Sequence, residues 1–450
     1  MTIRALLIPI VFCAGTALAF GQERGAAVPR IVTLREALDL ASQNNHRVRI
    51  ARSAIDEKQR AKDVAKSAYF PVVRTDSSYM HVTDTQLVEL PAGSLGTVGD
   101  SLIPSRPLII SQGALSTTTF GTGVSQPLTP LLKVKASNDI AEAEVKASVG
   151  KARQIENSIA LKVHELYYGI LIADRRRSAL QAKIRASEDV QIERVQQVKY
   201  GAALDADLIE SRAQSLQSKQ ELLTTDLQLS DLHMQFNDVI GLPLTTPVAL
   251  DPNVAEAVAE GCPLEECVKL AMESHPEIAE ARAAVERAAS AVRLAKFEFV
   301  PDIDVFARYS HQNNVPFLAE NFGTFGVRLS YDLFDGGKKR ATVRERSTQL
   351  AQARENLARI EDDVELRVQA AHNKLDRTRQ MIAVSEELLA LRAENGRMTL
   401  EQVAHGSALR SQSLATAAQE LEAKATLLQS RLESVQAAAE MDEAIGRTPR

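Results

Sequence analysis

The hydrophobic pattern of the chain contains long stretches with helical spacing and no interior proline. The first follows Pro130 and continues for about seventy residues to Tyr200-Gly201, and a second helical stretch extends from Asp207 to Ile240. At ~1.5 Å per residue, the first helix would reach roughly 110 Å, well beyond the core of an ordinary globular domain. A helix of this length must bury its apolar side against partners of similar length.

The same order of segments occurs twice, which predicts a duplicated fold. Segments after the predicted strands recur at an offset of 205, and segments before them recur at an offset of 230. The predicted parts are a leader at 1–19, an N-terminal segment at 20–33, a first repeat at 34–246, a linker at 247–262 and a second repeat at 263–450.

In each repeat, one helix precedes a β-hairpin. Thr33 and Glu36 have capping-box spacing and predict a helix from Leu34 to about Tyr69. This helix and the one that begins at Asp207 each have about 35 residues. Placed end to end they match the long helix, so each repeat should pair one continuous rod with one two-piece rod.

Alternating apolar and polar residues predict hairpins at about 72–126 and 302–334. In the second repeat, Ile303, Val305 and Tyr309 lie on one face, and Asp304 and Arg308 lie on the other. The change of offset from 230 to 205 makes the first connecting loop about 25 residues longer. Such length variation is typical of exposed loops.

The helices that close each repeat carry apolar residues stepping by four and three, which favours coiled-coil packing. A soluble helical bundle would show the same stepping, so the pattern alone does not separate the two. The predicted seams are Ile209, Ala213, Leu216, Leu223, Leu227 and Met234 in the first repeat, and Leu414, Ala418, Leu421, Ala425, Leu428, Leu432, Val435 and Ala439 in the second.

Composition agrees with helices packed through small residues, because aromatic residues make up 4% of the chain and tryptophan is absent. A net charge of −5 and the lack of a basic block give no reason to expect nucleic acid.

An export signal is predicted by Arg4, the apolar run that follows it and Ala17-Leu18-Ala19. Export permits a Cys262–Cys267 disulfide, but helical spacing favours one linker cysteine and one packed helix cysteine.

Strand counting then predicts assembly. Each repeat supplies two strands with one apolar face, so one chain supplies four, which cannot close a barrel. Three chains would supply twelve strands, an even number suitable for an outer-membrane barrel, and enough helices to enclose a tube. The sequence therefore predicts a mostly α fold with a small β part, completed in a homotrimer.

The doubled order of helix, strands, long helix, glycine turn and helix resembles the TolC family of outer membrane efflux proteins. The local matches are Leu34-Arg-Glu-Ala-Leu38, Ala68-Tyr-Phe-Pro71, Ser125-Gln-Pro-Leu128, His164-Glu-Leu-Tyr-Tyr168 and Tyr200-Gly201. The resemblance covers nearly the whole chain after the leader. It implies a 12-stranded barrel in the outer membrane, a long coiled-coil α-barrel crossing the periplasm, and docking to a periplasmic adaptor protein and an inner-membrane pump.

Several residues are expected to serve the channel. Gly201 and Gly406 mark the turns at the periplasmic tips, and the residues just beyond them are candidates for a mouth that opens and closes. These are Asp205, Asp207, Arg410 and Gln412, although a solvated helix start would explain them equally well. The family's acidic position is matched by Asp207 but not by Gln412. Candidate aromatics at the membrane interface are Tyr79, Tyr309, Phe306 and Phe325.

Two other classes of function fit the sequence less well. A periplasmic coiled-coil adaptor or scaffold would have one hairpin with flanking β-domains, whereas this chain has two copies with apolar-faced strands. An enzyme is not indicated, because the sequence shows no nucleophile with its base, no metal cluster and no phosphate loop. His164-Glu165 lacks the second histidine of a zinc motif, since position 168 is tyrosine. No cofactor or metal is therefore expected.

Overall fold

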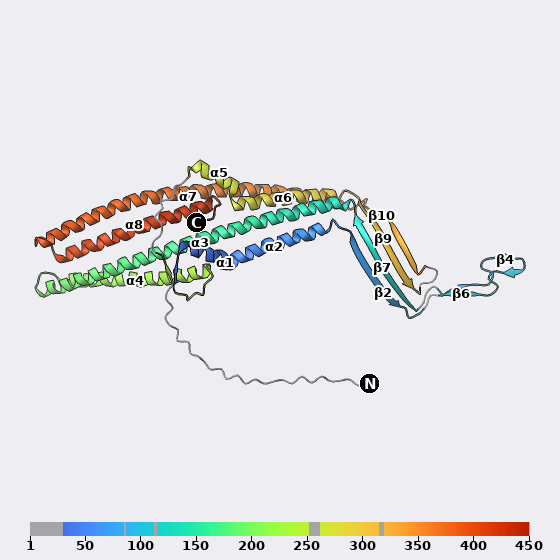
Figure 1. Cartoon of the computed structure of the whole chain (residues 1–450), viewed down its shortest axis with the longest axis horizontal. Helices are drawn as coiled ribbons and strands as arrows, with labels where there is room; N and C mark the ends of the chain where they lie inside the picture. Colours follow the sequence, from blue (N-terminus) through green and yellow to red (C-terminus); the bar gives the residue numbers. More distant parts are fainter. Residues whose placement is uncertain (1–29, 85–86, 112–114, 252–261, 315–318, 450) are drawn as a thin grey trace, which may run out of the picture.

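The computed structural model describes residues 30–84, 87–111, 115–251, 262–314 and 319–449. The predicted leader at 1–19 lies outside the described residues. The chain forms a long bundle of helices with a tilted β-sheet at one end (Figure 1). The tips of both helical hairpins lie together at the other end.

Two long helices form the continuous rods of the bundle. Helix α3 comprises Pro130–Lys199 and helix α7 comprises Lys338–Ala404. Each turns back into a shorter helix, α4 (Asp205–Val239) or α8 (Arg410–Ala444). Figure 1 shows α4 along one half of α3 and α2 along the other half, so the expected two-piece rod is present.

The helix expected from Leu34 to about Tyr69 is broken in two, which corrects the prediction. It consists of α1 (Leu34–Asn44) and α2 (His46–Ser67). The second repeat has the same break, between α5 (Leu264–Ser274) and α6 (Pro276–Phe297). At the first break, Asn45 has an extended backbone and its Oδ1 accepts a hydrogen bond from the Arg47 amide at 2.9 Å. The side chain therefore caps a new helix.

Four long strands form one sheet in the order β10-β9-β7-β2, and every neighbouring pair is antiparallel. Their bounds are β2 Val72–His81, β7 Ser116–Pro127, β9 Asp302–Asn313 and β10 Asn321–Ser330. The second hairpin, predicted to extend to about residue 334, ends at Ser330, so Tyr331 and Leu333 lie beyond the last strand. The two edge strands, β2 and β10, come from different repeats.

The long loop of the first hairpin contains short strands that the sequence analysis did not predict. They pair as two small antiparallel sheets beyond the main one, β3 with β6 and β4 with β5. Their bounds are β3 Leu87–Leu90, β4 Thr97–Val98, β5 Ser101–Leu102 and β6 Leu108–Ser111.

A second unpredicted feature joins the N-terminal segment to the linker at mid-length. Strand β1 (Arg30–Val32) pairs in parallel with β8 (Val248–Leu250). Beside them lies the larger hydrophobic cluster, in which Tyr167, Tyr168 and Phe236 are almost fully buried. The main core therefore lies around the helix breaks rather than along the whole rod.

The predicted leucine seam of α4 is wrong for the single chain. Buried positions on α4 include Ser215, Ser218 and Thr225, whereas Leu223 is 70% exposed. Small side chains allow α4 to approach α3 closely, and the leucine stripe then points away from α3. The predicted seam of α8 is right only near its C-terminal end, where Ala439 is buried and Leu432 and Val435 pack against the larger cluster. Nearer the tip, the buried positions differ from the predicted ones and are built largely from small residues: Ala423, Leu427, Ser430, Ser434 and Ala437.

The expectation of two unpaired cysteines is also wrong. Cys262 and Cys267 form a disulfide with their Cα atoms 5.9 Å apart. Cys262 lies outside α5, and Pro263 between them has an extended backbone with ψ of 142°. The chain therefore bends back over the first turn of α5, and the spacing within a regular helix does not apply.

Candidate channel wall and mouth

The four-stranded sheet has one apolar face that is exposed to solvent in the single chain. Its register aligns Val73, Val124, Ala307 and Phe325 on one rung across all four strands. Since directly paired residues share a face, the neighbouring odd-numbered positions of β2, β9 and β10 also belong to it. Exposed members are Val73, Tyr79, Phe120, Val124, Val305, Tyr309, Phe325, Val327 and Leu329.

The opposite face of the sheet is polar. Arg308 on β9 forms an ion pair with Asp76 on β2, reaching across the intervening strand β7. Gly121 on β7 lies under this contact, and a Cβ atom there would collide with the guanidinium group. A sheet with one apolar and one charged face is suited to separate lipid from an aqueous lumen.

Three of the four candidate interface aromatics lie on the apolar face, and the fourth does not. Phe306 is on the polar face, where the Arg328 guanidinium lies 5.2 Å from its ring centroid. Along β9 the even-numbered positions belong to the polar face, so the alternation in the sequence already indicated that Phe306 lies there. Phe306 is therefore removed from the set, and Tyr79, Tyr309 and Phe325 stay as predictions.

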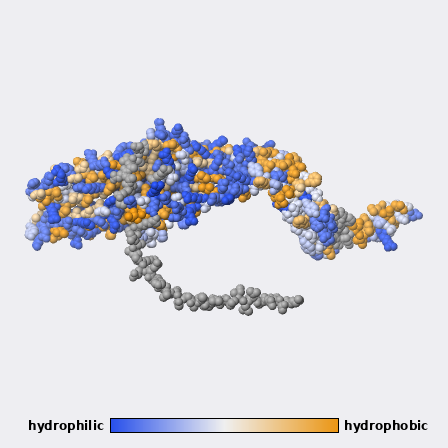
Figure 2. Space-filling model, in the orientation of Figure 1, coloured by the Kyte–Doolittle hydropathy of each residue, from blue (hydrophilic) through white to orange (hydrophobic). Residues whose placement is uncertain are grey.

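Sequence reasoning missed a second group of aromatic residues, at the junction between helices and sheet. Phe334 follows β10 and is 89% exposed, and Phe70 precedes β2 and is 69% exposed. Figure 2 shows hydrophobic surface where the helices meet the sheet. The available signals were an aromatic residue directly before Pro71, where β2 begins, and another just before the Asp335-Gly336-Gly337 turn that leads into α7.

The helical tips are built alike in both repeats. Gly201 and Gly406 have φ of 70° and 71°, in the left-handed region that favours glycine. Beyond each glycine, the backbone amide before the next helix donates to a side chain three residues on: Leu204 to Asp207 Oδ2, and Leu409 to Gln412 Oε1, both at 3.1 Å.

Asp207 and Gln412 therefore have the same structural role as helix caps, and only Asp207 adds a charge. The neighbouring candidates Asp205 and Arg410 begin α4 and α8 and are exposed. In Figure 1 the two tips lie side by side, so the four side chains belong to one end of the molecule.

A charged cluster lies near the middle of the rod, where the repeats meet. Glu277 of α6 accepts hydrogen bonds from Arg367 of α7 at 3.1 Å and from Gln154 of α3 at 2.7 Å. Burial raises the pKa of the Glu277 carboxyl, but the hydrogen bond and positive charge of Arg367 outweigh burial, so its pKa lies below the usual value. The cluster ties three helices together.

The described ranges, 30–84, 87–111, 115–251, 262–314 and 319–449, contain neither a membrane-spanning helix nor a metal-binding cluster. None of the helices there combines the length and apolar character needed to cross a bilayer. The same residues contain no cluster of three or more histidine, cysteine, aspartate or glutamate side chains able to hold a metal ion.

A sequence model of the family described as outer membrane efflux protein matches residues 37–235 and 267–447, which together make up most of the chain. The chain belongs to this family. The match covers both repeats, as the duplicated architecture requires. The chain is thus an efflux channel of the outer membrane with a large periplasmic part, and the adaptor or scaffold hypothesis is not supported.

Known relatives agree with this assignment. The outer membrane efflux protein BepC of Brucella suis biovar 1 (strain 1330) is 23% identical over 362 residues, which cover 80% of this chain and 73% of that protein. Among solved structures, the CmeC outer membrane channel of Campylobacter jejuni superposes with a TM-score of 0.75 at 13% identity, covering 98% of this chain and 94% of that chain.

A second solved structure gives the same result. The outer membrane protein VceC of Vibrio cholerae superposes with a TM-score of 0.73 at 14% identity, covering 93% of this chain and 97% of that chain. Similarity at such low identity establishes the fold. The predicted TolC-like fold is thereby confirmed, including its long coiled-coil helices and small β part.

Proposed function

We propose that three copies of this chain assemble into one duct that carries solutes passively from the periplasm across the outer membrane. The observation that supports the proposal is the four-stranded sheet, which has an exposed apolar face and two unpaired edges. Open strand edges are not tolerated in lipid, and twelve strands from three copies would remove them. No catalytic step is part of this proposal.

The duct would receive its cargo at the helical tips. We infer that a periplasmic adaptor protein docks there and connects the channel to an inner-membrane pump, which supplies the energy. The exposed tips, with Gly201 and Gly406 at their turns, are the part of the molecule farthest from the sheet (Figure 1). Asp205, Asp207, Arg410 and Gln412 would then surround the mouth.

Channel activity can be tested by inserting the purified full-length protein into planar lipid bilayers. We expect discrete single-channel conductance steps. A preparation that enters the bilayer and remains assembled, yet never conducts ions at any voltage or salt concentration, would contradict the duct.

The mouth is tested by two substitutions at Asp207. Asp207→Gln should keep the helix cap, because Gln412 caps the equivalent helix, while removing the charge. Asp207→Arg also reverses the charge. If Asp207 takes part in links that narrow the mouth, both variants should raise the single-channel conductance, and Asp207→Arg should raise it more. Unchanged conductance in both would exclude Asp207 from the gate.

A further inference from the structure

Two glycines lie at equivalent positions on the polar face of the sheet, the face that would line the lumen. Gly121 of β7 and Gly326 of β10 are related by the offset of 205 between the repeats. Their partners across the ladder are Asp76 and Phe306, two even-numbered residues of that face. A glycine inside a strand weakens the strand and often marks the close approach of another group. Each glycine therefore calls for an approaching group.

At Gly121 the approaching group is the guanidinium of Arg308, which extends from β9 across β7 and forms an ion pair with Asp76 of β2. A Cβ atom on Gly121 would lie 2.7 Å from Arg308 Cζ and 2.9 Å from its Nε. The same Nε donates to Ser310 Oγ at 3.2 Å. Among the residues of β7, only Gly121 is buried, because this side chain covers it. Arg308 is thus held against the wall instead of extending into the lumen.

Gly326 accommodates an aromatic ring in the same way. It pairs directly with Phe306 of β9, and a Cβ atom on Gly326 would touch the ring at 3.4 Å. The guanidinium of Arg328 lies over this ring, 5.2 Å from its centroid. Phe306 is half-buried by these contacts. Two neighbouring inward-facing residues of β9 therefore lie along the wall, one over each glycine.

We propose that Gly121 and Gly326 are seats that keep the long side chains of β9 folded against the inner wall of the barrel. Gly121 and Asp76 then act as positioning residues for Arg308, and together they set the bore and the charge that a passing solute meets. The inference rests on the proposed duct and names residues of its inner wall. A Cβ atom at position 121 would turn Arg308 toward the lumen.

The position of Arg308 also determines how much free positive charge this level of the barrel carries. While Arg308 is seated, its charge is compensated by Asp76 at the wall. Once freed, its guanidinium would move nearer the axis, whereas the Asp76 carboxylate would stay on β2. Cationic side chains that line a pore favour anions over cations. The seated arrangement therefore keeps the barrel less selective between ions.

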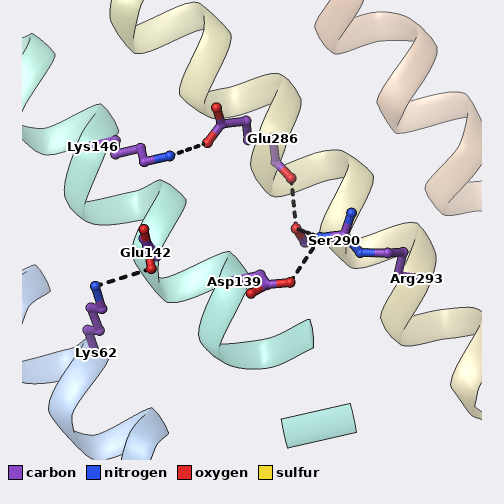
Figure 3. Close-up of polar contacts among 7 residues, drawn as sticks. All are labelled: Lys62, Asp139, Glu142, Lys146, Glu286, Ser290 and Arg293. Atoms are coloured by element: carbon purple, nitrogen blue, oxygen red, sulfur yellow. Dashed lines mark hydrogen bonds and ion pairs between the residues drawn. The ribbon is translucent and has the colours of Figure 1, made fainter. Parts of the chain in front are cut away.

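A brace between the two repeats is the alternative role of the Arg308–Asp76 pair. The repeats are already joined by the ladder between β7 and β9 and, in the helical part, by ion pairs such as Asp139 of α3 with Arg293 of α6 at 3.0 Å (Figure 3). The side chains of Arg308 and Asp76 are 41% and 52% exposed. Exposed ion pairs contribute little to stability, so the brace does not explain why position 121 is glycine.

The first repeat supplies a matched substitution for Arg308. The offset of 230 that relates β2 to β9 places Ser78 at the equivalent position. Ser78 Oγ lies 2.7 Å from Thr119 Oγ1 on the adjacent strand and does not extend further. Arg308→Ser therefore replaces the long side chain by one that the same wall already accommodates.

The seating of Arg308 is tested with phenylglyoxal, a reagent for guanidinium groups, on the full-length protein in detergent. Gly121→Ala should fold, because the atoms that collide with the new Cβ belong to the end of a flexible side chain. Asp76→Asn frees the same guanidinium by removing its partner. Mass spectrometry should show Arg308 modified roughly two- to fivefold faster in both variants, the factor by which an exposed ion pair protects its members.

Gly123→Ala is the control for this experiment. Gly123 lies on the same face of β7, opposite Arg74, but a Cβ atom there would make only ordinary contacts, at 3.4 Å or more. The rate of Arg308 modification should therefore equal that of the unaltered protein. An equal rate in Gly121→Ala as well would overturn the seat.

The effect on the bore is tested by single-channel recording in planar lipid bilayers. Gly121→Ala should lower the conductance and shift the reversal potential in a salt gradient toward anion selectivity, and adding Arg308→Ser should reverse both changes. Each variant is also recorded together with Asp207→Arg, because a narrow mouth in series would mask a change in the barrel. Unchanged conductance and selectivity in both backgrounds would contradict the role in the bore.

Failure of the seats is distinguishable from failure of the duct. The modification of Arg308 by phenylglyoxal is measured without any current. An unaltered protein that never conducts would refute the duct. A conducting channel in which Gly121→Ala and Gly123→Ala behave alike would refute the seats alone.

Discussion

Asn45 and His275 occupy equivalent helix breaks, and each caps the helix that follows, one with an amide side chain and the other with an imidazole. Asn45 accepts from the Arg47 amide and donates through Nδ2 to the Val239 carbonyl at 2.9 Å. His275 Nδ1 accepts from the Glu277 amide at 3.2 Å, while its buried Nε2 has no partner among the described residues. The histidine cap is therefore incompletely satisfied and sensitive to protonation.

Burial, with the positive charge of Arg367, lowers the pKa of His275 to about 4. At a pH below about 6.5, the pKa of histidine in the unfolded chain, the unfolded chain binds a proton on this histidine and the folded chain does not. Folding stability is thus lost as pH falls from about 6.5 to 4, by about 3 kcal/mol at most.

His275→Asn should flatten this pH dependence and keep the cap, because asparagine serves at position 45. The melting temperature of the detergent-solubilised protein, measured at pH 7.5 and pH 4.5, checks the expectation. His164 is also buried, with its pKa lowered to about 4, so part of the slope will remain. His405→Asn, at an exposed position at the end of α7, provides a control for the loss of one histidine. An unaltered slope in His275→Asn would refute this role.

At the scale of elements, glycines end helices in two different settings. Gly201 and Gly446 both have positive φ, at 70° and 82°. Gly201 is surrounded by open space, whereas a Cβ atom on Gly446 would lie 2.7 Å from His275 Cα. The end of α8 therefore packs directly onto the α5–α6 break, and the tip glycine serves only the turn.

Alanine substitutions separate these two roles. Gly201→Ala introduces only backbone strain and should cost about 1 kcal/mol. Gly446→Ala adds a collision with backbone that cannot rotate away, so its loss of stability should be clearly larger. Denaturant unfolding of the two variants, side by side with the unaltered protein, measures the difference. Equal losses would show that the α8 end is not tightly seated.

Elements were predictable from the sequence where one local signal decides them. The hydrophobic period and the absence of proline identified α3 and α7, and alternation identified the four long strands. The break at Asn45 was missed because nothing in a good helical pattern marks it except a capping side chain. The leucine stripe of α4 was predicted to be a packed seam, although it is exposed in the single chain. Periodicity indicates that a helix has an apolar face, but it does not indicate which element covers that face.

The candidate site shows the same division. The apolar face that holds Tyr79, Tyr309 and Phe325 followed from alternation, and Phe306 failed because its even position was overlooked. The disulfide was missed because the bend before α5 sets the distance between Cys262 and Cys267, and sequence spacing does not. Asp207 and Gln412 were compared by charge, whereas the structure gives both a capping role.

At the scale of the whole molecule, one chain is an incomplete wall. It has a sheet with two open edges, an apolar face turned outward and leucines without a covering helix. Each of these features is costly in isolation and would be removed by the proposed joining of copies edge to edge. The proposed channel therefore depends on assembly more than on any single residue.

The mass of the detergent-solubilised complex tests this most directly. Native mass spectrometry or light scattering, corrected for bound detergent, should give three times the mass of one chain, which is 49.1 kDa with the predicted leader included. A stable single chain that stays folded and dispersed in detergent-free buffer would contradict the account.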